Sequence, residues 1–129
     1  NKENNARKLK KITQWGDIKW RSFQNAFAQS SLDVNATDIP DLRNVTSTRL
    51  MFWNIGKLKG NKYFNEWNVS NVTDMNGMFR DSEAFNQALD NWNVSNVIDM
   101  TLMFFLVTNF NQPLNNWNVS KVTSMRAMF

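Results

Sequence analysis

One phrase of the sequence decides the fold: Trp67-Asn-Val-Ser-Asn-Val-Thr-Asp-Met-Asn-Gly-Met-Phe79. It recurs without gaps as Trp92–Phe104 and as Trp117–Phe129, so the tryptophans that open the three copies lie 25 residues apart. A fixed period of this length indicates a repeat architecture, in which each copy buries its apolar residues against the next.

Two weaker copies lie upstream of this phrase. Pro40–Phe52 matches it with proline in place of tryptophan, and Trp15–Phe27 matches it in outline. Because the last phenylalanines of Pro40–Phe52 and of the quoted phrase lie 27 residues apart, we expect a two-residue insertion in the loop-forming stretch 56–61. The sequence predicts a basic flank at 1–14 and a single repeat domain at 15–129 of about five coils: a divergent cap at 15–27, then 28–52, 53–79 with the insertion, 80–104 and 105–129.

Two patterns alternate within each coil. The first pattern has apolar residues at the spacing of one face of a short helix, at Val72, Met75, Met78 and Phe79. The segments Phe85–Trp92 and Phe110–Trp117 are bounded by asparagine, and Pro113 disfavours a helix in the second, so both are predicted to be extended. One short parallel β-strand and one short helix per coil predict an α/β solenoid.

The repeat aligns equivalent residues in apolar columns. Such columns could line a ligand groove, but at this spacing they are far more typical of the core of a repeat protein. Recurrent asparagines fit the acceptor pattern for glycosylation, but we favour hydrogen bonds to the backbone of adjacent coils. The main predicted core columns are Phe27, Phe52, Phe79, Phe104 and Phe129, and Trp67, Trp92 and Trp117.

Composition argues against an enzyme. The 129-residue chain has no cysteine and no histidine, which excludes disulfides, thiolate or imidazole metal ligands and nucleophiles that need either residue. Carboxylates such as Asp74 and Asp99 have no histidine, cysteine or glycine-rich loop as a partner. We expect no catalytic residue, metal, cofactor or small-molecule substrate, and no apolar run is long enough to span a membrane.

The net charge of +4 comes from separate clusters, one in the N-terminal flank and one at Lys57, Lys59 and Lys62. The lysines are segregated and most aromatics fall in the core columns. This distribution argues against nucleic-acid binding, which usually needs a continuous basic face.

Candidate partner-binding residues lie where the period is broken or where extended segments face outward. The basic insertion is either a solvated loop, the ordinary interpretation, or a binding loop. The run Phe105-Leu-Val107 replaces a polar turn, so it is either a thickened core or an exposed patch. The candidates are Lys57, Lys59, Lys62, Tyr63, Gln87, Asp90, Asn91, Phe105, Leu106, Gln112, Asn115 and Asn116.

The phrases "FNQPLNNWNVSKVTSMRAMF" (residues 110–129) and "ITQWGDIKW" (residues 12–20) resemble the BspA-like leucine-rich repeat surface proteins, which include mycoplasma-type surface lipoproteins. The resemblance implies a leucine-rich-repeat-like solenoid, a location at the cell surface or outside the cell, and a role in adhesion or virulence. We therefore expect a module that binds a host or bacterial surface protein. The alternative is a structural spacer or stalk within a longer array.

The last predicted coil stops at Phe129 without a polar cap. An apolar end needs further coils or a partner, so we expect a piece of a longer array and end-to-end self-association of the isolated chain.

Overall fold

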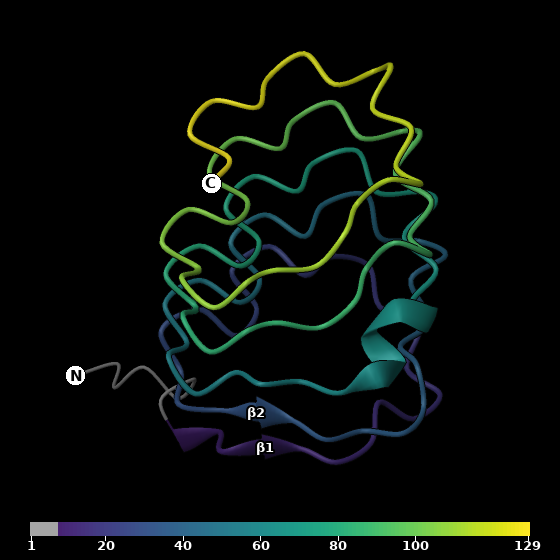
Figure 1. Ribbon diagram of the computed structural model, residues 1–129. Coiled ribbons are helices and arrows are strands. Elements are labelled where there is room, and N and C mark those ends of the chain that lie inside the picture. Colours follow the sequence, from purple (N-terminus) through teal and green to yellow (C-terminus); the bar gives the residue numbers. More distant parts are fainter. Residues whose placement is uncertain (1–7) are drawn as a thin grey trace, which may run out of the picture.

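The repeat copies lie one above another in the computed structural model, which describes residues 8–129 (Figure 1). Each copy forms one layer of a stack that runs from the purple N-terminal layer to the yellow C-terminal one. Regular elements in the described residues are few. They are the strands β1 (Lys11–Ile12) and β2 (Asp33–Val34), which pair in parallel, and the 3₁₀ helix η2 (Lys62–Glu66).

The predicted leucine-rich-repeat-like solenoid, with a strand and a helix in every coil, is wrong. No α-helix occurs in residues 8–129, and the only two strands are two residues long. Most of the described chain is irregular. Outside this sheet, strand-type pairing in the described residues is limited to single-residue parallel bridges. One joins Lys19 to Asp41, and the others run through Ser47, Asp74, Asp99 and Ser124.

The predicted helix is replaced by a run of tight turns over residues 75–82, called the turn segment here. The amides of Met75, Gly77 and Phe79 donate to carbonyls of the next layer at 2.8–3.1 Å, whereas an α-helix would bond them four residues back. Gly77 and Asp81 have φ of 60° and 58°, which closes a turn every four residues. The apolar residues at intervals of three and four positions therefore come from successive turns and not from a helix.

The predicted strand at Phe85–Trp92, called the extended segment here, does not form a ladder. The amides of residues 86–90 have no recorded backbone partner in the described part of the chain. Side chains join the layers instead. Gln87 Nε2 donates to the Lys59 carbonyl at 2.9 Å, and the Asn91 amide donates to Asn65 Oδ1 at 3.0 Å.

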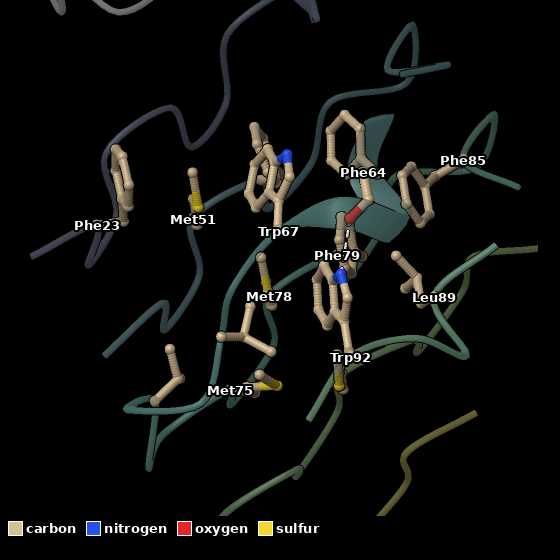
Figure 2. Packing of buried hydrophobic residues seen from close by; sticks show 14 of the residues in the cluster. Phe23, Met51, Phe64, Trp67, Met75, Met78, Phe79, Phe85, Leu89 and Trp92 are labelled. Atoms are coloured by element: carbon tan, nitrogen blue, oxygen red, sulfur yellow. Dashed lines mark hydrogen bonds between the residues drawn. The ribbon is translucent and has the colours of Figure 1, made fainter. Parts of the chain in front are cut away.

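The core consists of columns of stacked rings (Figure 2). Phe52, Phe79 and Phe104 are buried with centroids 5.7 and 5.8 Å apart, whereas Phe129 is 71% exposed. Trp92 lies between the other repeat tryptophans, with its centroid 6.3 Å from Trp67 and 6.5 Å from Trp117. Its Nε1 donates to the Phe64 carbonyl at 2.7 Å, the dashed line in Figure 2. Buried indoles need such a partner.

The two-residue insertion lies slightly later than predicted and forms η2. Asn61 stabilises it from both sides, because its Oδ1 accepts from the Tyr63 amide and its Nδ2 donates to the Ala36 carbonyl. Phe64 is buried and packs against Trp67 at 4.5 Å. The insertion therefore anchors one aromatic residue in the core and leaves its neighbours at the surface. No helix in the described residues is long and apolar enough to cross a membrane.

Candidate functional site

Two surface regions depart from the periodic pattern. The first, called the aromatic corner here, consists of Trp53, Arg80, Phe105 and Leu106. The second, called the η2 groove, is lined by Lys62, Tyr63, Asn65, Glu66, Gln87 and Ala88. The described residues contain no group of three or more histidine, cysteine, aspartate or glutamate residues that could hold a metal ion.

The aromatic corner stacks three side chains from successive layers. The Arg80 guanidinium carbon lies 5.8 Å from the Trp53 ring centroid and 5.9 Å from that of Phe105, within the range of cation–π attraction. Asp81 fixes the arrangement, because its Oδ2 accepts from Trp53 Nε1 at 3.0 Å and from Arg80 Nε at 3.2 Å. The corner is therefore a preformed surface of rings and one guanidinium.

Residues 105–107 were predicted to form either a thickened core or an exposed patch, and each alternative holds for part of the run. Val107 is buried in the core, Phe105 is half-buried, and the Leu106 side chain is 53% exposed. Leu106 also has φ of 57°, a left-handed conformation that costs a residue with a branched apolar side chain roughly 1–2 kcal/mol. The equivalent positions in the two preceding layers are Asn54 and Asp81, which tolerate this conformation better.

The η2 groove collects three of the predicted partner-binding residues: Lys62, Tyr63 and Gln87. It has a volume of about 430 Å³, and the Lys62 ammonium lies 5.5 Å from the centroid of the Tyr63 ring. Asn65 connects it to the next layer, because its Oδ1 accepts from the Asn91 amide and its Nδ2 donates to Asp90. Lys57 and Lys59 are exposed but do not line the groove.

A second, smaller groove of about 350 Å³ contains Asp90, Asn91 and Asn116. Gln112 lines neither groove and donates to the Asn86 carbonyl and Oδ1, and the exposed Asn115 lines neither. The structure thus places eight of the twelve predicted partner-binding residues in the two grooves and the aromatic corner, whereas Lys57, Lys59, Gln112 and Asn115 lie in none of them.

A third groove, of about 510 Å³, lies beside Pro40, where the repeat tryptophan is missing. Two of its charged groups, Arg43 and Asp41, already bind each other. The guanidinium of Arg43 donates to the Asp41 carboxylate at 2.9, 3.2 and 2.7 Å, and these bonds lower the pKa of Asp41 to about 2. The groove therefore has fewer free polar groups to offer a ligand.

Stacked Asp74 and Asp99 do not form an acid–base pair. Each carboxylate accepts the amide two residues further on, from Asn76 and Thr101 respectively, and so closes a turn. Burial raises the pKa of Asp99, but hydrogen bonds from Thr101 and Asn76 together with the charge of Arg49 outweigh it, and the net shift is downward. An ionised carboxylate engaged in this way is poorly suited to proton transfer at neutral pH.

Sequence reasoning missed Trp53, Arg80, Asn65 and Glu66. Trp53 and Arg80 carry a recognisable signal, since each directly follows a core phenylalanine, as Phe105 does. Their contact could not be predicted without knowing that residues separated by 27 and 25 positions lie one above the other.

Comparison with known proteins gives one match. No curated protein and no solved structure is significantly similar to the chain. A family model described as "Mycoplasma protein of unknown function, DUF285" matches residues 21–129, a range that includes the aromatic corner and the η2 groove. The chain belongs to this DUF285 family of mycoplasma-type repeat proteins.

Proposed function

We propose that the chain is a non-catalytic protein-binding module of a mycoplasma-type surface protein, with a role in adhesion or host interaction. The observation that carries the proposal is the aromatic corner. Tryptophan and arginine are enriched among the residues that dominate binding energy at protein interfaces, and aromatic residues are enriched at interface cores. Here Trp53, Arg80 and Phe105 are held in one stack before any partner arrives.

Leu106 supports the proposal because folding does not explain it. Its side chain is largely exposed, so it contributes little to the core, and its positive φ is unfavourable for leucine. Asparagine at the equivalent Asn54 meets the same backbone requirement at lower cost. An exposed leucine next to Phe105 gives a partner an apolar contact at the edge of the stacked rings.

The corner favours an apolar side chain flanked by a carboxylate as its partner. The Nη atoms of Arg80 have no hydrogen-bond partner recorded in the described residues, whereas its Nε is bound to Asp81. A guanidinium held between two rings can bind a carboxylate through two parallel hydrogen bonds. The chain's net charge of +4 would also steer an acidic partner toward it.

The resemblance to BspA-like surface proteins supports a location at the cell surface or outside the cell, and this location is part of the proposal. The fold supports a binding role in a general way, because a stack of layers fixes side chains from successive repeats in one geometry. Such preorganisation reduces the entropy lost on binding.

The test is binding of the intact chain to host cells and to their isolated surface proteins. Leu106→Asn, which copies Asn54, and Arg80→Ala should each weaken binding at least about tenfold, or roughly 1.4 kcal/mol. Ile98→Asn is the matched control, because Ile98 is 48% exposed and lies outside the corner. Absence of saturable binding, or an equal loss with Ile98→Asn, would contradict the proposal.

A spacer or stalk is the second candidate, and the continuous ring columns favour it because they couple every layer to the next. Adhesion of the full-length protein separates the two functions. A spacer would keep its adhesion after Leu106→Asn and Arg80→Ala, and would lose it only when the array is shortened.

A further inference from the structure

The η2 groove lies beside a helix that the next two layers lack. Counted back from the repeat tryptophans, the equivalent residues 87–91 and 112–116 belong to no helix or strand. The insertion turns the chain outward at η2 and places Tyr63 beside Gln87 and Ala88 of the next layer. We infer that this groove binds a saccharide, at a site separate from the aromatic corner and sharing no residue with it.

Tyr63 provides the aromatic platform. Its ring is half-buried and lines the groove, while the adjacent Phe64 is anchored in the core and fixes the backbone beneath it. The face of an aromatic ring is electron-rich, so it attracts the weakly positive C–H groups on one side of a pyranose ring. The Lys62 ammonium lies 5.5 Å from the ring centroid, within the range of cation–π attraction.

The polar groups around Tyr63 are suited to hydroxyl groups. The Tyr63 hydroxyl, the Glu66 carboxylate and Gln87 Oε1 have no hydrogen-bond partner recorded among the described residues. Gln87 is nevertheless oriented, because its Nε2 is bound to the Lys59 carbonyl. Sugar hydroxyls both donate and accept, so they can satisfy these acceptors and accept from Lys62.

Asn65 is a positioning residue in this site. Its Oδ1 and Nδ2 are engaged with Asn91 and Asp90, so it has little capacity left for a ligand and instead fixes the groove against the next layer. The groove volume of about 430 Å³ lies within the range of sites for small ligands. Because the groove is open and offers a single aromatic ring, we expect weak affinity for an individual sugar.

The inference adds a ligand class that the sequence did not lead us to expect. An acidic peptide would leave Glu66 facing like charge, and an apolar ligand would leave the free oxygens of Tyr63 and Gln87 unpaired, which is costly on desolvation. A neutral sugar avoids both costs. The saccharide site is independent of the protein-binding proposal, because the groove shares no residue with the aromatic corner.

The experiment titrates the intact chain with free N-acetylglucosamine, galactose and glucose, followed by ¹H–¹⁵N NMR. At least one sugar should give saturable shifts at Tyr63, Asn65 and the Gln87 side-chain amide. Gln87→Ala should weaken the response at least about fivefold, and Tyr63→Ala should abolish it, while Tyr63→Phe keeps the platform and most of the response.

The matched control is Gln112→Ala. Gln112 occupies the position of Gln87 one layer later, also donates to a backbone carbonyl, and lines no groove. It should leave sugar binding unchanged. The inference is overturned if none of the three sugars gives saturable shifts at the groove, if Gln112→Ala weakens the response as much as Gln87→Ala, or if only an acidic peptide shifts these signals.

Discussion

The turn segment and the extended segment join successive layers of the stack through different kinds of hydrogen bond. Both must join one layer to the next without a helix or a ladder of strands. The turn segment at 75–82 uses backbone amides, which donate to the carbonyls of Asp99, Thr101, Met103 and Phe105. The extended segment at 85–92 uses side chains, including Gln87 Nε2 and the Trp92 indole.

The difference explains which positions vary between the copies. A backbone hydrogen bond does not depend on the side chain, so the outward position of the turn segment is Asn76 in one layer, Thr101 in the next and Arg126 in the last. A side-chain bond needs a particular donor, so asparagine, glutamine and tryptophan recur in the extended segments. We expect substitutions to affect these two regions differently.

The largest effect should come from the tryptophan column. Trp92→Ala removes a buried ring and one of the two donors to the Phe64 carbonyl, the other being the Trp67 amide, so it should lower the free energy of unfolding by roughly 3–5 kcal/mol. Trp92→Phe keeps most of the ring and loses mainly the hydrogen bond, so its cost should be about 1–3 kcal/mol. Urea unfolding of the three proteins measures both. Equal stability of wild type and Trp92→Ala would contradict this account.

The next effect tests the turn segment at its most crowded point. A Cβ added at Gly77 would lie 2.6 Å from Leu50 Cδ2, and φ there is +60°, so Gly77→Ala should cost about 1–3 kcal/mol. Leu50→Ala in the same chain should recover part of the loss, which a double-mutant cycle measures. Gly56→Ala is the matched control, since a Cβ at Gly56 meets nothing within 4 Å. A similar loss at both glycines would rule out the contact with Leu50.

Single substitutions of polar residues should reduce stability more in the extended segment than in the turn segment. Asn86 Oδ1 accepts the Asn111 amide at 2.8 Å, so Asn86→Ala should cost about 1 kcal/mol. Asn76→Thr, which copies Thr101 in the turn segment, keeps the backbone bonds and replaces the Asn76 Nδ2 donor to Asp99 with a hydroxyl, as Thr101 uses its own hydroxyl toward Ser124, so it should change stability by less than about 0.5 kcal/mol. Thermal unfolding of both variants measures the difference. A larger loss for Asn76→Thr would reverse the comparison.

The smallest effect should appear on acidification, because protonation weakens bonds to carboxylates and leaves backbone bonds intact. Asp38 accepts the amides of Trp15 and Gly16; the Trp15 bond is the main cause of the lowered pKa of Asp38, and burial opposes it. A folded-state pKa below the ordinary 3.8 stabilises the fold above that pH, and the stabilisation is lost as the pH falls through the lowered value.

The pKa of Asp41 is about 2, so protonation of the two carboxylates removes stability over the range from about pH 4 to about pH 2. Asp38→Asn should therefore be less stable than wild type at pH 7, and the gap should narrow toward pH 2. Chemical denaturation at several pH values, followed by tryptophan fluorescence, measures the gap. A constant difference across this window would show that ionisation of Asp38 does not contribute.

The period and the apolar columns could be predicted from the sequence, because three gapless copies align the buried residues without any knowledge of backbone geometry. The helix could not be excluded, since apolar residues at spacings of three and four fit both a helix and a run of four-residue turns. The left-handed conformations that distinguish the two fall on Leu50, Leu102 and Leu106 as well as on Gly77, and leucine does not predict them.

The candidate site could be predicted only in part from the sequence. Lys62 and Tyr63 could be chosen because they lie at the break in the period, and Gln87 because it faces outward from an extended segment, but their convergence on one groove depends on η2. The predicted bonds from asparagine to adjacent layers form in one column, where Asn71 and Asn96 donate to the carbonyls of Arg43 and Ser70. In the other column the side chains close turns within their own layer, with the amides of Ser70, Ser95 and Ser120 donating to Asn68, Asn93 and Asn118.

The central claim is that backbone bonds join the layers in one segment and side chains join them in the other. Amide hydrogen exchange at single-residue resolution tests it most directly. We predict strong protection at Met75, Gly77, Phe79 and Asp81, which donate to the next layer, and rapid exchange at residues 86–90, whose amides have no recorded partner in the described chain. Comparable protection of both segments would contradict the claim, because it would require a backbone ladder in the extended segment.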